Sequence, residues 1–265
     1  MDDTEQSVAL YDPGEIVREE HNRGDRLVVA ISNLAAWLFP ILMIAICTQV
    51  VVRQLGNNQA WLDDFQWWLY GTACLVGIGY AVTTNSHVRV DIRYDNFPQA
   101  KKDRTDVAAL AWFFLPFIIM CWDFTIHYAI ASVIADEGSD SPNGLHNLWI
   151  LKVIMNLAFI FIGVATYAAY YRVLSRLVQP TLWRQLLWAL PTTFMVLNLM
   201  IFYGIWWFLR LTTPSDVVNR QIGRMPIFDE LEIGPYEIEP TILMTFVATF
   251  LVIFVAWLFG RKREA

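Results

Sequence analysis

Charged side chains are scarce in this sequence. They make up 17% of its 265 residues, whereas 56% are hydrophobic and 15% are aromatic. Soluble domains carry roughly 25% charged residues, so the deficit indicates a protein whose surface largely faces lipid. The net charge of -6 comes without a basic stripe. This argues against nucleic acid as a partner, because too few clustered cations are present to neutralise a phosphate backbone.

Cysteine is almost absent, and the common catalytic motifs are missing. The three cysteines lie in different apolar runs, without the spacing of a zinc or haem-attachment motif, so we interpret them as small hydrophobic residues. The sequence contains no nucleophile elbow, no zinc-protease motif, no phosphate-binding loop and no glycine-rich dinucleotide turn. We therefore expect no enzyme activity and no cofactor or metal site in this chain.

Long apolar runs are abundant. A helix needs about 20 mostly apolar residues to cross the hydrocarbon core of a bilayer. The runs that satisfy this requirement are 27–52, 61–83, 106–134, 148–174, 185–211 and 240–260. Alternating barrel patterns are absent, so helices are the favoured spanning structure. The sequence predicts an all-α, polytopic membrane protein with about six transmembrane helices. The first run is too long for a signal peptide, and we expect it to be retained as a span.

Basic residues are distributed unevenly between the loops. If the N-terminus is cytoplasmic, 14 of the 19 lysines and arginines fall in cytoplasmic segments and only four in outer loops. The positive-inside rule therefore places both termini in the cytoplasm. This topology divides the chain into a cytoplasmic segment (1–26), a four-helix core (27–176) and two further helices (177–265). The last part contains a long acidic outer loop, 212–239.

Two ionisable residues lie within the third predicted helix. Asp123 and His127 are one turn apart and share a face. Ionisable groups at the centre of a membrane cost about 2.5–3.5 kcal/mol on insertion scales, so they suggest a function. The pair could relay protons or bind an ion. Its position near the outer end of the helix favours a mutually satisfied pair or a contact with a neighbouring helix.

Other charged residues lie near the outer helix ends. Lys152 could pair with an acid of the second outer loop, such as Glu137, or extend to the membrane surface. Asp63 and Asp64 begin the second helix, where carboxylates complement the positive end of the helix dipole. A role of these two acids in contacting a partner subunit is the alternative.

Two patches of sequence resemble a known family. The first patch has an arginine after the first helix, a tryptophan and two acids at the start of the second, and the motif HVRVD after it: Arg53, Trp61, Asp63, Asp64, His87, Val88, Arg89, Val90 and Asp91. The second patch is Glu137, Ser139, Ser141, Pro142, Trp149 and Lys152. Together they resemble the DctQ-like small membrane subunit of tripartite ATP-independent periplasmic (TRAP) transporters, and most closely the mannitol or chloroaromatic branch.

The resemblance covers roughly residues 27–175, and the sequence departs from the family pattern in three places. The proline that usually precedes the tryptophan of helix four is missing. The Ile-Pro that often follows the lysine is replaced by Val153-Ile154-Met155. Most members have four helices, whereas this chain has two more.

The resemblance implies a scaffold in the bacterial inner membrane. A large DctM-like membrane subunit would carry the substrate and the coupling sodium ions, and a soluble DctP-like periplasmic protein would deliver organic acids or related solutes. The small subunit would pack in the lipid bilayer beside the large one and help to dock the periplasmic protein. The residues of the two patches are then candidates for subunit contacts.

Two other functions remain open at this point. Asp123 and His127 are compatible with the membrane anchor of a respiratory enzyme that binds haem or quinone. A haem with two histidine ligands from this chain alone is disfavoured, since only His127 of the four histidines lies well inside a span. The remaining alternative is a standalone sensor or structural membrane protein.

Overall fold

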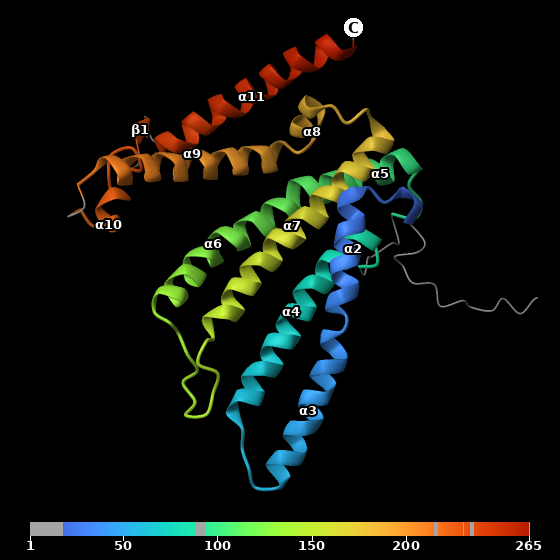
Figure 1. The fold of residues 1–265 in the computed structure, drawn as a ribbon. Helices are drawn as coiled ribbons and strands as arrows, with labels where there is room; N and C mark the ends of the chain where they lie inside the picture. Colours follow the sequence, from blue (N-terminus) through green and yellow to red (C-terminus); the bar gives the residue numbers. More distant parts are fainter. Residues whose placement is uncertain (1–17, 88–93, 215–216, 230, 234–235, 265) are drawn as a thin grey trace, which may run out of the picture. The chain divides into compact units, whose positions relative to one another are not determined.

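A computed structural model describes residues 18–87, 94–214, 217–229, 231–233 and 236–264. The regular secondary structure of this part of the chain is helical apart from one short hairpin (Figure 1). It divides into two compact units. The first unit comprises Met1–Lys102 and Phe117–Val173, and the second comprises Asp103–Pro116 and Leu174–Ala265.

Long helices account for most of the first unit. In chain order the helices up to residue 177 are η1 (Arg18–Glu20), α2 (Arg23–Ala35), α3 (Leu38–Gln54), α4 (Ala60–Thr84), α5 (Gln99–Ala108), η2 (Ala109–Phe114), α6 (Leu115–Ile134) and α7 (Trp149–Leu177). The π-helical segment η2 joins α5 and α6 into one continuous helical stretch. Helix α4 is capped by Asn85, which adopts the left-handed conformation (φ 57°) common at helix C-termini.

Prolines explain why the predicted helices are interrupted. A proline lacks the backbone N–H and clashes with the carbonyl four residues earlier. Pro40 accordingly follows the break between α2 and α3, and Pro191 follows the break at Ala189 between α8 and α9. Pro116 follows the π-helical segment η2, a local change that accommodates a proline within a helix. Hydropathy alone predicted each of these stretches as one unbroken helix.

Close approach of helices holds the first unit together. Helix α4 packs along α2 and α3. A Cβ atom on Gly79 of α4 would lie 2.5 Å from the ring of Phe161 in α7, so only glycine allows this approach. Gly24 of α2 is similarly close to Ala168 of α7. Small residues at helix contacts are typical of membrane bundles, in which backbones approach closely.

The second unit is built on two long helices. Its elements after α7 are α8 (Leu182–Trp188), α9 (Leu190–Thr212), α10 (Asn219–Ile222), β1 (Leu231–Ile233), β2 (Tyr236–Ile238) and α11 (Pro240–Glu264). Helix α11 packs against α9 and α8. The Asn198 amide donates to the Thr245 hydroxyl across α9 and α11 (3.3 Å), and Thr241, Thr245 and Thr249 are buried along one side of α11.

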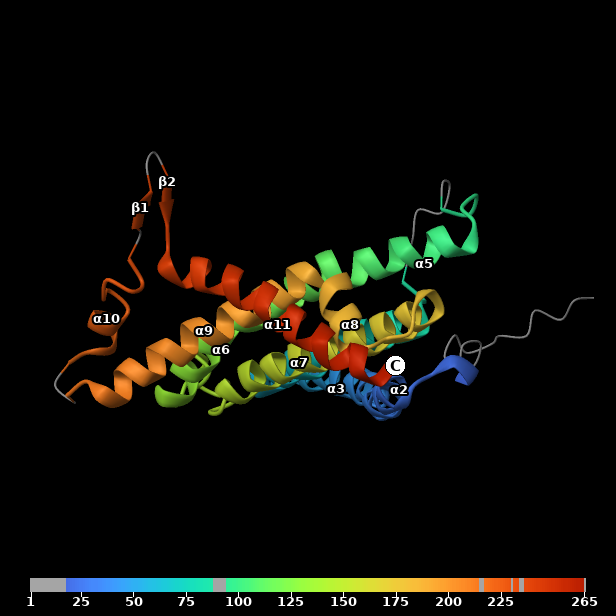
Figure 2. The same cartoon turned by 90° about the horizontal axis from the view of Figure 1, so that it is seen from above.

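The long acidic loop predicted at 212–239 contains secondary structure. Strands β1 and β2 form an antiparallel hairpin that leads into α11 (Figure 2). The ring of Phe228 lies 5.0 Å from that of Phe202 in α9, and Ile222 of α10 is fully buried. The described parts of this segment are therefore anchored on α9. The hairpin is a small departure from the all-α prediction.

Five helical stretches are long and apolar enough to cross a membrane, by length and composition, within the described residues. They are Arg23–Gln54, Gln99–Ile134, Trp149–Leu177, Leu190–Thr212 and Pro240–Gly260. Many of their large apolar side chains are exposed, for example Phe124 (73%) and Val247 (69%), as expected where lipid replaces water. The predicted second span forms α4, which is not among these five stretches.

Candidate functional site

The two loops of the first unit, between α3 and α4 and between α6 and α7, meet at one end of its helices. We call this region the loop end and define it as residues 49–66 and 132–152. The link between the loops is Asp64, whose carboxylate accepts a hydrogen bond from the backbone N–H of Leu145 (3.0 Å). Because Asp64 is on α4 and Leu145 precedes α7, this bond joins two hairpins that are distant in sequence.

A chain of polar side chains connects α3 to the start of α4. The Gln49 amide donates to Asp63, and the Gln66 amide donates to Gln49. Arg53 also approaches Asp63, with 3.4 Å between Nη2 and Oδ2. Gln49 is buried, so its amide group needs the hydrogen-bond partners that Asp63 and Gln66 supply. The structure thus brings together Arg53 and Asp63, two residues of the first family-like patch.

Glu137 is the centre of a second polar group. Its Oε2 atom accepts hydrogen bonds from the Lys152 ammonium and the Ser132 hydroxyl. The ammonium of Lys152 also lies 3.8 Å from the centre of the Tyr128 ring, at cation–π distance. The hydrogen bonds from Lys152 and Ser132 hold the pKa of Glu137 below its ordinary value. The carboxylate therefore stays ionised, and it ties the loop after α6 to the first turn of α7.

Further hydrogen bonds, several of them made by family-like residues, fix the backbone of the loop between α6 and α7. Asp136 has a positive φ of 45° and accepts a hydrogen bond from the Trp149 indole (3.1 Å). The Ser139 hydroxyl accepts from the backbone N–H of Ser141 (3.3 Å), and the Ser139 N–H donates to the Leu145 carbonyl (2.9 Å). These bonds give the loop a defined path between α6 and α7.

Four other predicted site residues lie in the described part of the chain: Trp61, His87, Asp123 and His127. The Trp61 indole donates to Gln59 beside it (3.2 Å). His87 is exposed just after α4, while Arg89 and Asp91 lie outside the described residues. On α6, Asp123 is half-buried and His127 is exposed. No three His, Cys, Asp or Glu side chains in the described ranges gather closely enough to hold a metal ion.

The opposite end of the first unit contains a polar cluster that the sequence did not reveal. Asp25 of α2 is fully buried and forms an ion pair with Arg172 of α7 (2.6 Å). Arg172 also donates to the backbone carbonyl of Thr83 at the end of α4 (2.7 Å). One guanidinium therefore joins α2, α4 and α7. We call this group the Asp25–Arg172 cluster.

A capping box places Asp25 in that cluster. The Asn22 side chain accepts from the Asp25 N–H (3.0 Å), and the Asp25 carboxylate accepts from the Asn22 N–H (3.1 Å). The Asn22 amide also donates to the carbonyl of Ala168 in α7 (2.8 Å). The pattern Asn-x-x-Asp before an apolar run is a signal for such a helix start, and it was the clue available in the sequence.

His21 lies beside the same cluster and is almost completely buried. Burial, followed by the positive charge of Arg172, lowers the pKa of His21 below its ordinary value, although Asp25 opposes the shift. The neutral form of this imidazole is therefore favoured. The cluster thus combines a buried ion pair with a neutral histidine at the start of α2.

Together, the apolar helices and the two polar ends define a multi-pass α-helical membrane protein. The family model for tripartite ATP-independent periplasmic transporters, DctQ component, matches residues 42–179, slightly more than half of the chain. The chain therefore belongs to the DctQ family, whose members are transporter components. The match begins in α3, ends just beyond α7 and includes the whole loop end. No curated protein and no solved structure matches the chain.

Proposed function

We propose that this chain is the fixed small subunit of a TRAP transporter, packing beside a DctM-like large subunit that moves substrate together with sodium. The observation that carries the proposal is the family match, which covers the two hairpins that polar contacts join at both ends. Two hairpins that are joined at both ends resist movement relative to each other, as a fixed scaffold requires. Family membership favours this function over the respiratory anchor.

The proposed topology has six spans with both termini in the cytoplasm. The distribution of lysine and arginine supports this orientation. Helix α4 has 25 residues, which at about 1.5 Å per residue gives roughly 37 Å, more than the hydrocarbon thickness. Helix α4 packs along α2 and α3, and its Asp63, Gln66 and Thr83 form hydrogen bonds with protein groups. In this topology the loop end faces the periplasm.

Two elements are proposed to contribute separately to docking of the periplasmic protein: the loop end of the first unit and the segment 212–239 of the second. The loop end carries Asp64, Asp136 and Glu137 in defined positions, and the second segment is acidic and anchored on α9. A DctP-like protein with a basic face would be complementary to these acids. The solutes carried by such a system are organic acids or related compounds, and their binding site would lie on the other subunits.

Affinity purification from gently solubilised native membranes tests the scaffold function. A tag at the C-terminus should recover a stoichiometric large permease. Liposomes containing both membrane subunits and the periplasmic protein should take up solute with sodium, whereas liposomes with this chain alone should not. Sodium-driven uptake by this chain alone, or its recovery with respiratory subunits, would refute the proposal.

Replacing Lys152 with Met tests the docking surface within the same assay. The change removes the hydrogen bond to Glu137 and leaves the loop after α6 less constrained. We expect the large subunit to co-purify as before, while the concentration of periplasmic protein needed for half-maximal uptake rises several-fold. Arg26→Met, which changes an exposed arginine of α2, is the control and should leave this concentration unchanged.

A further inference from the structure

Helix α2 is attached to the first unit through its more polar side. Its buried residues are Asp25, Val28 and Ser32, which share one face at helical spacing. The large apolar residues of α2 lie elsewhere on the helix and are exposed: Leu27 (56%), Ile31 (39%) and Leu34 (75%). Because Val28 is the only apolar residue of this helix that is buried, the attachment of α2 depends largely on its polar contacts.

These polar contacts are concentrated in the first turn of α2. The Asn22 amide donates to the Ala168 carbonyl of α7 (2.8 Å), and the Asp25 carboxylate pairs with Arg172 of the same helix (2.6 Å). Gly24 also lies close to Ala168. The start of α2 is thus held to α7 by contacts within four consecutive residues, and a change in charge at this point affects all of them.

His21 immediately precedes this first turn and is only 5% exposed. Its Nε2 atom is buried and forms no hydrogen bond with the part of the chain that the structure describes. The charged groups of the described chain that act on it are Arg18, Asp25, Arg26 and Arg172. Helix α4 packs on α2 as well, but its last two turns contain no charged residue. Three of the four groups are cations, so protonation of His21 adds positive charge where positive charge already predominates.

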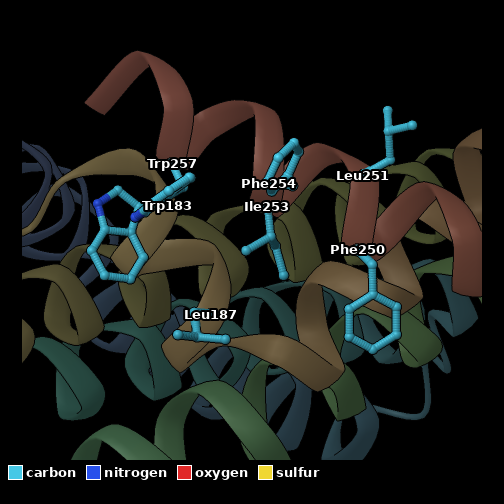
Figure 3. Close-up of a pocket in the computed structure, with 7 residues that line it drawn as sticks. All are labelled: Trp183, Leu187, Phe250, Leu251, Ile253, Phe254 and Trp257. Carbon is cyan, nitrogen blue, oxygen red and sulfur yellow. The ribbon is translucent and has the colours of Figure 1, made fainter. Parts of the chain in front are cut away.

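The surroundings of His21 differ from the apolar packing in the second unit. There α8 and α11 form a groove lined by leucine, isoleucine, phenylalanine and tryptophan side chains, among them Trp183, Phe254 and Trp257 (Figure 3). Protons cannot change the charge of such a surface, because none of its lining side chains titrates. A response to pH needs buried ionisable groups, and the Asp25–Arg172 cluster with His21 provides them.

The chain has a joint at the other end of α2. The helix ends at Ala35, and α3 begins at Leu38 after a turn at Ala36 and Trp37. Because the regular helix is interrupted there, α2 can change direction while α3 remains packed against α4.

We propose that protonation of His21 releases the start of α2 from α7 and α4, and that α2 then turns away about the joint at Ala36 and Trp37. The imidazolium repels Arg172 and competes with it for the Asp25 carboxylate, which weakens the pair that holds α2. The exposed apolar residues of α2 stay in lipid throughout. In the proposed topology this end of the first unit faces the cytoplasm, so α2 responds to acidification of the cytoplasm. The release itself does not depend on the proposed function.

The direction of the pH dependence follows from the pKa of His21. Burial, and then the positive charge of Arg172, hold this pKa below its ordinary value of 6.5 while α2 is attached. A released His21 is exposed and regains the ordinary value, so the released form binds the proton more tightly. Acid therefore favours release. The ratio of released to attached molecules should rise as the pH falls below 6.5, by at most tenfold per pH unit for one proton.

Distances between two spin labels on the full-length chain test this switch. The three native cysteines are replaced by alanine, and labels at Arg23→Cys and Val164→Cys report the separation of α2 from α7. Both positions are exposed, and neither belongs to the contacts that hold α2. Electron paramagnetic resonance in lipid nanodiscs should give one distance at pH 8. A second, longer distance should appear below pH 6.5, and its share should grow down to pH 5.

Two controls separate release of α2 from a general loosening. His21→Gln removes the titrating group at similar size and should leave one distance at every pH; His21→Asn is a second neutral variant with the same expectation. Labels at Asn58→Cys and Leu157→Cys lie at exposed positions of the α3–α4 loop and of α7. Their distance should not change with pH, since Glu137 at the loop end stays ionised over this range.

Any of three results would overturn the switch. The first is a single distance between residues 23 and 164 from pH 8 to pH 5. The second is a longer distance that persists in both neutral variants, which would assign the titration to another group. The third is an equal change between residues 58 and 157, which would mean that the whole first unit loosens. All measurements use this chain alone, so their failure leaves the proposed transporter function untouched.

Discussion

Replacing Asp25 with Asn tests whether the Asp25–Arg172 cluster stabilises the first unit through a buried charge pair. Asparagine has nearly the same shape and can still accept the capping bond from the Asn22 N–H. The change removes the negative charge beside Arg172, which is 8% exposed and still donates to the Thr83 carbonyl. Leaving one buried charge without its partner costs about 3–5 kcal/mol, so we expect a loss of that order in the free energy of unfolding.

The exposed ion pair of Arg53 and Asp63 provides a matched control. Its charged atoms are 3.4 Å apart, and its side chains are 59% and 47% exposed. Asp63→Asn makes the same chemical change and can keep the bond from Gln49, so it should cost less than about 1 kcal/mol.

Reversible unfolding of the purified chain in mixed detergent micelles measures both changes. Adding Arg172→Met to Asp25→Asn removes the unpaired cation, and the double variant should be more stable than Asp25→Asn alone. Equal small losses for Asp25→Asn and Asp63→Asn would show that burial does not strengthen the first pair. A double variant that is destabilised by the sum of the single changes would show that the two charges do not act together.

Two further predictions concern packing and protonation. Gly79→Ala should destabilise the chain by about 1–3 kcal/mol, because its Cβ would overlap the Phe161 ring; Gly77→Ala, on the same helix with open space around it, should be neutral or slightly stabilising in the same unfolding experiment. Since the pKa of His21 is lowered from 6.5 by burial and by Arg172, the folded chain binds fewer protons there than the unfolded chain. The contribution of His21 to the free energy of unfolding should therefore be fully present above pH 6.5 and be lost as the pH falls from 6.5 through the folded pKa. In unfolding curves measured between pH 5 and 8, His21→Gln should weaken this pH dependence. A pH profile that is unchanged in His21→Gln would assign the titration to another group.

The helices were the most predictable part of the fold, because lipid requires long apolar runs and leaves a strong pattern. The predicted run 148–174 corresponds to α7, and 240–260 falls within α11. The prolines were visible in the sequence too, but hydropathy takes no account of the backbone clash that a proline makes with the carbonyl four residues earlier. Hydropathy therefore merged α2 with α3 and α8 with α9. Residues 99–105 were missed because they are polar, although they form the first part of α5.

The candidate site was predictable only where partners are near in sequence. Lys152 and Glu137 are 15 residues apart, and the structure places the Lys152 ammonium against Glu137. Asp25 and Arg172 are separated by most of the family core, and each looked like an ordinary charge beside a span. Their pairing follows from the packing of α2 on α7, which depends on the close contact of Gly24 with Ala168. No single-sequence pattern encodes that contact.

The contacts at the two ends of the first unit have a mechanical consequence. At the loop end Asp64 joins α4 to the loop before α7, and at the other end Arg172 of α7 is bonded to the last turn of α4. Sliding one hairpin past the other by a helical turn, about 5.4 Å, would break both links at once. Shear between the hairpins is therefore opposed at two points that are separated by the length of a helix. A force applied to one hairpin is carried by the other, and the pair is displaced or held as one body.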